Sequence, residues 1–167
     1  VQPFTFILAA IDTYRPYFDR GLTLTIHSDF SAKLGLGSSA AVTVATLGAV
    51  QTYLKQSLPP LALIKIGGEI IRRVQGVGSG ADIAAAVIGG VVAYRSEPVE
   101  AIRIPCQPEI TLVCSGSKMK TVDVVHHLEN LWQDVPQHYQ QQLATIAQCA
   151  EKGCCAAQEA NWLLLAQ

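Results

Sequence analysis

The chain has 167 residues, 50% of them hydrophobic and 15% charged, and its formal net charge is -1. This composition indicates a globular protein with a buried core and excludes an intrinsically disordered chain. The twelve Lys and Arg residues form no basic stripe, and the longest apolar stretches, 40–50 and 83–94, are shorter than the ~20 residues that span a bilayer, so we expect neither nucleic acid nor a membrane as partner.

The first predicted element is a strand over residues 22–30. Apolar Leu22, Leu24 and Ile26 alternate with polar residues, which is the pattern of a half-buried strand. His27 and Asp29 stand just before the loop that follows. Either side chain could face a site in that loop, but a solvent-facing strand edge is the favoured interpretation.

Residues 35–42 read Gly-Leu-Gly-Ser-Ser-Ala-Ala-Val, a glycine turn that enters a helix of small apolar residues. Glycine lets the backbone come close to a ligand, and the first amides of a helix have no internal partners, so with the helix dipole they attract anions. The segment predicts a phosphate site over the amides of Gly37 to Ala40, with Ser38 or Ser39 offering a hydroxyl to the phosphate or to Mg2+. The alternative is a serine N-cap without a ligand. A Walker A loop is excluded because no Lys follows Gly37.

Two helices are predicted next. The first, from Ser38 to about Gln56, is apolar nearly all round, so we expect it to be buried under a sheet. Pro59 and Pro60 end this unit, and a second helix over about 61–74 has apolar residues at helical spacing with charged residues between them. This second helix leads into another glycine-rich segment.

That segment, 75–90, reads Gln-Gly-Val-Gly-Ser-Gly-Ala-Asp-Ile-Ala-Ala-Ala-Val-Ile-Gly-Gly and again enters an apolar helix. Asp82 is the single acid at the start of this helix. As a helix cap it would be catalytically silent, whereas beside a phosphoryl acceptor it could take the hydroxyl proton or orient the hydroxyl for attack. Taken singly, the segment favours the cap.

The rest of the chain is predicted as a hairpin followed by a second unit. Short strands over 91–95 and 101–104 flank a turn at 96–99, and a domain boundary is expected at 105–108. The second unit is predicted to contain a strand, a turn and two helices, with Gly153 as a candidate break in the second helix. Their ranges are 110–114, 115–120, about 122–131, and from about 136 onward.

The five cysteines are an odd number, include no Cys-x-x-Cys pair and follow no signal peptide, which predicts a reducing cytoplasm. Cys149, Cys154 and Cys155 are near one another on the last predicted helix, with His138 upstream. A metal site there is conceivable, but the spacing matches no zinc pattern, so ordinary thiols are favoured.

Together the two glycine segments resemble the GHMP family of small-molecule kinases, named for galactokinase, homoserine kinase, mevalonate kinase and phosphomevalonate kinase. The family's ATP-binding motif is matched by residues 35–41, and its glycine-rich segment with the catalytic Asp is matched by residues 78–82. The resemblance implies ATP-dependent phosphorylation of a small molecule, with ATP and Mg2+ as cofactors. It also implies an α+β fold of two domains, one like domain 2 of ribosomal protein S5 and one ferredoxin-like. Residues 1–105 would form part of the first domain and residues 106–167 part of the second.

The resemblance also assigns roles to residues. It places Asp82 beside the acceptor and makes Ser38 and Ser39 the candidates for contact with magnesium and the triphosphate. Relatives often carry a magnesium-binding Glu on the preceding helix, but Ile71 occupies that position. Glu69, two residues away, is the candidate ligand here, and a solvated helix face is the alternative. The implied cofactor-binding residues are Gly35, Leu36, Gly37, Ser38, Ser39 and Ala40, and the implied substrate-side residues are Gly78, Ser79 and Gly80.

Within the family, Lys33 favours the phosphomevalonate kinase branch. Many members have Pro-x-Gly-x before the Gly-Leu-Gly-Ser-Ser core, whereas this chain has Ser31, Ala32, Lys33 and Leu34 there. An ammonium there would offset the repulsion between the acceptor phosphate and the γ-phosphate of ATP. The alternative is a solvated loop lysine. Segment 114–121 resembles a substrate-side turn of the same branch, with Ser117 and Lys118 as candidate contacts, and its alternative is an exposed basic turn.

Two further family motifs are not found in this chain: an amino-terminal Pro-Gly run and a carboxyl-terminal glycine loop. We therefore expect the chain to be the central part of a kinase that converts phosphomevalonate to diphosphomevalonate. The alternatives are a mevalonate kinase, another GHMP kinase acting on a small-molecule hydroxyl, or a non-catalytic module derived from a kinase. The oligomeric state stays open, with a homodimer as one alternative.

Overall fold

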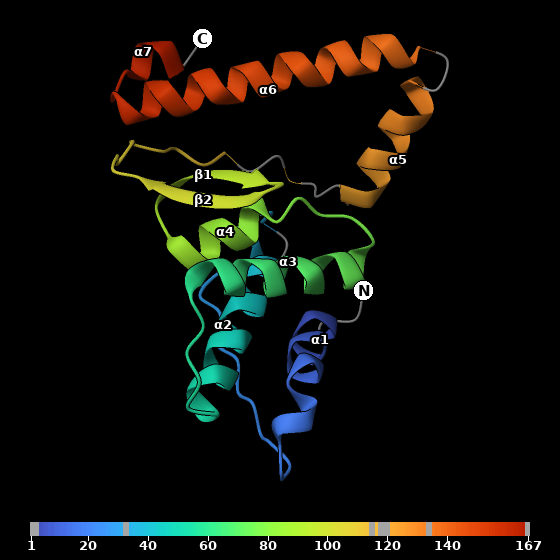
Figure 1. Ribbon diagram of the computed structural model, residues 1–167, viewed down its shortest axis with the longest axis vertical. Helices are drawn as coiled ribbons and strands as arrows, with labels where there is room; N and C mark the ends of the chain where they lie inside the picture. Colours follow the sequence, from blue (N-terminus) through green and yellow to red (C-terminus); the bar gives the residue numbers. More distant parts are fainter. Residues whose placement is uncertain (1–3, 32–33, 114–115, 117–120, 133–134, 166–167) are drawn as a thin grey trace.

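The computed structural model describes residues 4–31, 34–113, 116, 121–132 and 135–165. In chain order the elements are α1 (Thr5–Thr13), the 3-10 turn η1 (Arg15–Tyr17), α2 (Ser38–Tyr53), α3 (Pro60–Gln75), α4 (Ala81–Ile88), β1 (Val91–Ser96), β2 (Val99–Ile104), α5 (Thr121–Trp132), α6 (Pro136–Gln158) and α7 (Trp162–Leu165). Figure 1 shows α1, α2 and α3 at one end, α4 with the hairpin in the middle, and α5, α6 and α7 at the other end. The described part of the chain is thus a mixture of helices and a small sheet.

Helix α2 buries one face rather than its whole circumference. Ala40, Leu47 and Val50 are buried, while residues 48–49 are exposed. The helix packs against α1, α3 and α4. The prediction of a helix buried nearly all round under a sheet is therefore wrong, because the one sheet formed by the described residues is a hairpin that packs on α4.

Two buried clusters hold the first four helices together. The first consists of Ala10, Tyr14, Leu47, Val50 and Ile70, and the second of Phe6, Ala40, Ile71 and Ile83. Beside the first cluster, Gln51 Nε2 donates to Tyr14 Oη over 3.1 Å, so that this buried amide keeps a partner. The second cluster draws residues from the first turns of both α2 and α4, which places these two turns close together.

Helix α1 lies in a stretch for which the sequence predicts no element. Its N-cap, Phe4, makes no side-chain hydrogen bond, and no acidic residue lies in its first turn, so the usual start signals are missing. Phe6, Ile7 and Ala10 are buried along one side. Packing of this stripe against the neighbouring helices stabilises α1 in place of local signals.

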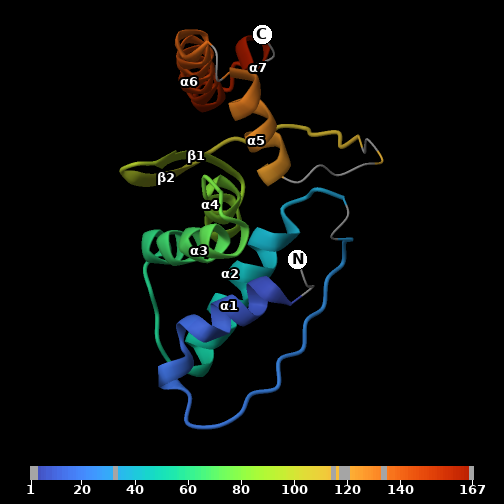
Figure 2. The same cartoon turned by 90° about the vertical axis from the view of Figure 1, so that its right-hand side faces the viewer.

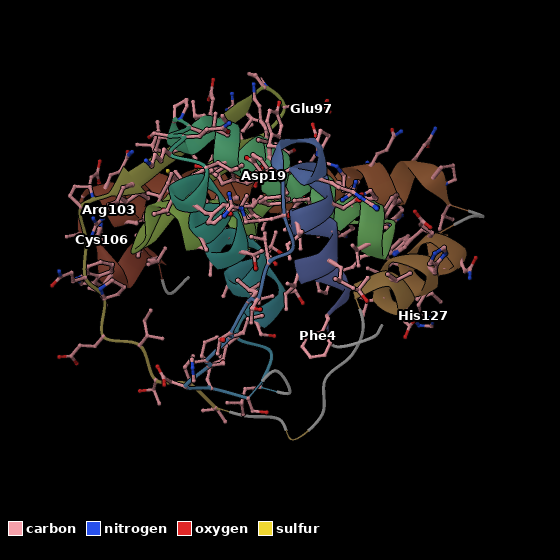
Figure 3. All side chains as sticks on the ribbon, turned by 90° about the horizontal axis from the view of Figure 1, so that it is seen from below. Phe4, Asp19, Glu97, Arg103, Cys106 and His127 are labelled. Atoms are coloured by element: carbon pink, nitrogen blue, oxygen red, sulfur yellow. The ribbon has the colours of Figure 1, made fainter. Side chains whose placement is uncertain are left out.

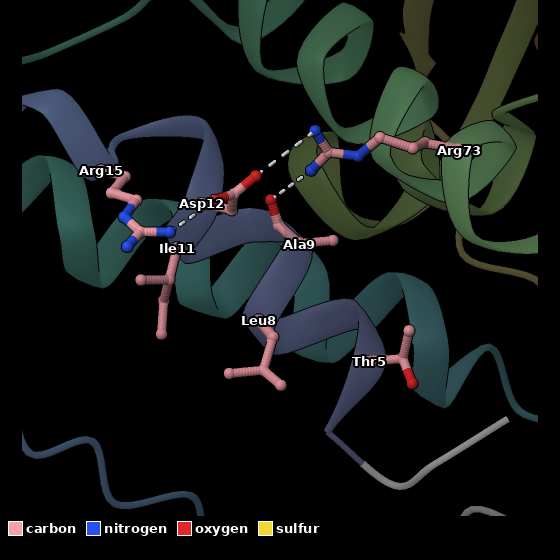
Figure 4. Close-up of a pocket in the computed structure, with 7 residues that line it drawn as sticks. All are labelled: Thr5, Leu8, Ala9, Ile11, Asp12, Arg15 and Arg73. Atoms are coloured by element: carbon pink, nitrogen blue, oxygen red, sulfur yellow. Dashed lines mark hydrogen bonds and ion pairs between the residues drawn. The ribbon is translucent and has the colours of Figure 1, made fainter.

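Helix α3 confirms the helix predicted over about 61–74 after the two prolines. It begins at Pro60 and ends at Gln75, and its C-cap, Gly76, has a left-handed φ of 80°. Arg73 of this helix reaches across to α1 (Figure 4). Its Nη2 donates to the Ala9 carbonyl oxygen over 2.6 Å, and its Nη1 lies 3.9 Å from Asp12 Oδ2. The guanidinium therefore ties α3 to α1.

Replacing Arg73 with methionine should remove this tie while keeping an apolar stem. We expect the free energy of unfolding to fall by roughly 0.5–1.5 kcal/mol, the net contribution of a hydrogen bond of this kind. The neighbouring Arg72→Met is a matched control, because within the described residues Arg72 has no side-chain hydrogen bond or ion pair. Urea denaturation of the two variants measures the difference, and equal losses would contradict the assignment.

The predicted hairpin is confirmed. Strands β1 and β2 pair antiparallel, from Val91 opposite Ile104 to Ser96 opposite Val99. The hairpin packs on α4 through β1. This pairing places Tyr94 in the middle of β1, on the strand that adjoins the glycine-rich segment.

The predicted strand over 22–30 is not formed. The chain leaves α1 and η1 at Asp19 (Figure 3) and runs as an extended segment apart from the helices (Figure 2). The apolar side chains of Leu22, Leu24 and Ile26 are 40–42% exposed. A strand needs a neighbour for its amides and carbonyls, and the two strands of the described chain pair with each other.

Helices α5, α6 and α7 form a separate group beyond the hairpin (Figures 1 and 2). Helix α6 continues through Gly153 without the break considered above. The strand predicted at 110–114 is wrong for residues 110–113, which are exposed and unpaired among the described residues, and Cys114 lies outside them. Within the described ranges, no helix has both the length and the apolar character needed to cross a membrane.

Candidate functional site

The first turn of α2 presents backbone amides without a side-chain cap. Gly37 is the N-cap, with a left-handed φ of 68°, and no side chain makes a capping hydrogen bond there. The helical ladder starts with the Ala41 amide, which donates to the Gly37 carbonyl over 2.9 Å. The amides of residues 38–40 precede this bond and have no intrahelical acceptor. The alternative of a serine N-cap is therefore wrong, since Ser38 and Ser39 are the first two residues of the helix itself.

The first turn of α4 carries the predicted acid. Gly80 is the N-cap, with a φ of 89°, and Asp82 is the second helical residue. Asp82 Oδ1 accepts a hydrogen bond from the Ile83 amide over 3.1 Å, and the residue is exposed. Ser79 Oγ accepts from the Ala81 amide over 3.3 Å. Asp82 thus holds one free amide of its own helix and still presents its carboxylate to solvent.

The core joins these two turns. Ala40 in α2 and Ile83 in α4 are 1% and 0% exposed and belong to one buried cluster with Ile71. Ile71 also supports the glycine segment, because a Cβ atom at Gly78 would lie 2.9 Å from its Cγ2. The two helix starts are therefore side by side, and each brings the positive end of a helix dipole to the same region.

Glu69 lies in a different setting from the α2 turn. Glu69 lines a cavity of about 620 Å3 between α3 and the hairpin, together with Gly78, Ser79 and Tyr94. No residue from 35–40 lines this cavity. The structure thus brings Glu69 beside the predicted substrate-side segment and leaves Ser38 and Ser39 outside that cavity.

Three predicted site residues, Lys33, Ser117 and Lys118, lie outside the described residues. Among the residues that the structure does describe, no group of three or more His, Cys, Asp or Glu could hold a metal ion. The first two residues of α2, Ser38 and Ser39, each carry a hydroxyl oxygen. Uncapped amides and hydroxyls are the groups that bind a polyphosphate, so the donor set at this turn fits a nucleotide phosphate.

Sequence reasoning missed one residue of this region. Tyr94 Oη donates to the Ser79 carbonyl over 2.9 Å. The contact joins residues fifteen positions apart on different elements, and the strand pattern of 91–95 carries no signal for it. Only the packing of the hairpin on α4 reveals the contact.

The chain is similar to one family model and to several curated kinases. Residues 5–90 match the family model of the GHMP kinases N terminal domain. Mevalonate kinase of Thermococcus sibiricus is 32% identical over 133 residues, which cover 80% of this chain and 40% of that protein. Mevalonate kinase of Thermococcus gammatolerans is 32% identical over 154 residues, with 89% and 45% covered. Homoserine kinase of Carboxydothermus hydrogenoformans is 33% identical over 108 residues, with 62% and 33% covered. The chain spans less than half the length of these curated relatives.

Proposed function

Because the chain belongs to the GHMP kinase family, we propose that it is part of an ATP-dependent kinase that phosphorylates a small molecule. The observation that carries the proposal is the pairing of two helix starts through Ala40 and Ile83. One start offers uncapped amides and two serine hydroxyls, and the other offers an exposed carboxylate. Phosphoryl transfer requires both an anion cradle and a group beside the attacking oxygen.

The α2 start would bind the triphosphate of ATP. The amides of residues 38–40 would donate to phosphate oxygens, and the loop residues Gly35, Leu36 and Gly37 would let the backbone approach them. Magnesium, when bound, would offset the negative charge of the triphosphate, with the Ser38 or Ser39 hydroxyl as ligand. Glu69 is a weaker proposal for that role, because no residue of 35–40 lines its cavity.

Asp82 would act on the acceptor. As the acceptor oxygen attacks the γ-phosphorus, its proton passes to the Asp82 carboxylate, the bond to the β-phosphate oxygen breaks, and ADP leaves. The same carboxylate could instead orient the hydroxyl without removing its proton. Gly78, Ser79 and Gly80, just before it, would line the acceptor side.

The chemistry of Asp82 bears on which acceptor is used. A base helps a hydroxyl group, whose proton is tightly held, more than it helps a phosphate, which is largely ionised at neutral pH. We therefore put mevalonate first, the substrate named for the two Thermococcus relatives. Phosphomevalonate is the second candidate, since Lys33 would offset the charge of its phosphate and Ser117 and Lys118 would lie on the substrate side.

The proposal extends to the architecture. Residues 1–105 would belong to an ATP-binding domain like domain 2 of ribosomal protein S5, and residues 106–167 to a ferredoxin-like domain. The separate grouping of α5, α6 and α7 beyond the hairpin supports a division near residue 105.

An ADP-release assay on the full-length protein tests the function. Mevalonate, phosphomevalonate, homoserine and a panel of sugars would each be offered with ATP and Mg2+. Turnover of mevalonate alone supports the first candidate, and turnover of phosphomevalonate alone supports the second and the role of Lys33. Turnover of another acceptor would retain the family chemistry and reject both substrates. An absence of ADP release with every acceptor would favour a non-catalytic module.

The serine pair at the start of α2 gives a mutational prediction. If a hydroxyl there contacts the triphosphate or magnesium, replacing Ser38 or Ser39 by alanine should reduce kcat/KM for ATP by about a hundredfold for the serine that makes the contact. Ser57→Ala, an exposed serine in the loop after α2, is the matched control. Steady-state kinetics measure the effect, and unchanged kinetics in both variants would reject a hydroxyl contact.

A further inference from the structure

The geometry points to Tyr94 as a positioning residue for the Asp82 segment, a role that rests on the proposed function. Tyr94 lies in β1, outside both glycine motifs, and would touch neither ATP nor the reacting atoms. Its effect would pass through the Ser79–Gly80 backbone, which leads directly into the first turn of α4. Asp82 is the second residue of that turn.

The hydroxyl of Tyr94 contacts this backbone directly. Tyr94 Oη donates to the Ser79 carbonyl over 2.9 Å. A Cβ atom at Gly80 would lie 2.8 Å from the same Oη and 3.6 Å from the Cζ of the ring. The hydroxyl therefore stands directly against the N-cap residue, where it leaves no space for a side chain.

Gly80 is the point at which this contact acts on the helix. Its left-handed φ of 89° turns the chain into α4, and its carbonyl accepts the first bond of the ladder from the Ala84 amide over 2.9 Å. A shift of Gly80 would thus rotate the first turn that carries Asp82. Among the described residues, the Tyr94 hydrogen bond is the one side-chain bond that reaches residues 78–82 from another element.

The other sides of the segment are apolar. A Cβ atom at Gly78 would meet Ile71 Cγ2 at 2.9 Å, and one at Gly67 of α3 would meet Ile83 Cγ2 at 2.8 Å. These close approaches fix how far α4 and the glycine segment stand from α3. Apolar contacts have no preferred direction, so the directed bond from Tyr94 is what selects one orientation of the Ser79 carbonyl.

Strand pairing fixes the backbone position of Tyr94. Tyr94 pairs with Ala101 in the antiparallel register, and β1 packs on α4. The side chain is half-buried and lines the same cavity as Ser79. Its hydroxyl is thus held at a fixed distance from the helix whose start it contacts.

The test removes the hydroxyl and keeps the ring. In the full-length protein, Tyr94→Phe should lower kcat roughly tenfold, because a misplaced catalytic group is costly, while KM for ATP stays within about twofold. Amide hydrogen exchange at residues 79–83 should become faster. Tyr17→Phe, an exposed tyrosine on η1, is the matched control and should change neither quantity.

A second variant probes the close approach itself. Gly80→Ala places a methyl group against the hydroxyl and puts a side chain at a left-handed φ of 89°, so it should lower kcat more than Tyr94→Phe does. In the double variant the hydroxyl is gone, so the combined loss should be smaller than the product of the two single losses. Strictly multiplicative losses would overturn the inference, because they would mean that the two positions do not act on each other.

The outcomes separate this inference from the proposed function. An active enzyme in which Tyr94→Phe only lowers the melting temperature, with kcat and exchange at 79–83 unchanged, would overturn the positioning role and leave the kinase intact. A wild-type protein without turnover on any acceptor would overturn the proposed function and, with it, the catalytic consequence of Tyr94. In that case, faster amide exchange at residues 79–83 in Tyr94→Phe would still show that the Tyr94 hydroxyl orders this segment. The proposed kinase activity would then be wrong, while the structural contact would be retained.

Discussion

Asp82→Asn is expected to lower kcat for a hydroxyl acceptor by about 10²- to 10⁴-fold, the usual contribution of a general base. Asparagine keeps an oxygen that can accept from the Ile83 amide, as Asp82 Oδ1 does at 3.1 Å. It cannot take up a proton. The substitution therefore removes the proposed chemistry and preserves the local helix bond.

The same variant should fold and bind nucleotide normally. Asp82 is exposed, and the proposed triphosphate contacts come from α2 rather than α4. Calorimetry with an ATP analogue and a thermal melt would verify both points. Asp123→Asn is the matched control, because Asp123 is also an acid in the first turn of an exposed helix, α5. Equal small losses in the two variants would make Asp82 a helix-terminal acid without a catalytic role.

The size of the Asp82→Asn loss also depends on the acceptor. A hydroxyl must lose its proton during the reaction, whereas a phosphate oxygen is already ionised at neutral pH. A loss of several orders of magnitude with mevalonate would indicate proton removal. A loss of only about tenfold with phosphomevalonate, below the range of a general base, would indicate that the carboxylate orients the acceptor.

The elements that could be predicted from the sequence are those with local signals. Helix α3 lies between Pro60 and Gly76, and the hairpin lies where the apolar strands flank a short turn. The glycine loops before α2 and α4 can likewise be predicted from the sequence, because only glycine readily adopts the left-handed conformation of Gly37 and Gly80. Backbone chemistry confined to a few neighbouring residues is enough to specify these features.

The features that could not be predicted depend on distant partners. The alternation in 22–30 predicts a strand, yet a strand exists only with a neighbour, and none pairs with this segment among the described residues. Helix α1 has no side-chain hydrogen bond at its N-cap and is stabilised by its buried stripe. At the site, sequence could name Asp82 but could not place it beside α2, and the contact of Tyr94 with Ser79 carries no sequence pattern at all.

The core that joins the two helix starts gives a prediction for stability. Ile83→Ala should lower the free energy of unfolding by about 2–5 kcal/mol, because Ile83 is fully buried and its removal leaves a cavity against Gly67 and its own cluster. Ile83→Val removes a single methylene and should cost about 0.5–1.5 kcal/mol. Urea denaturation measures both values.

Leu47→Ala separates the loss of stability from the loss of geometry. Leu47 is as fully buried as Ile83 but belongs to the cluster of α1, α2 and α3, away from the first turn of α4. The two alanine variants should therefore lose similar amounts of stability, while only Ile83→Ala should lower kcat when both are assayed well below their melting temperatures. Because Ile83 follows Asp82 and packs with Ala40, a cavity at this position lets the two helix starts move relative to each other. An equal fall of kcat in Leu47→Ala would show that activity follows overall stability, and the pairing of α2 with α4 would then not be what aligns the site.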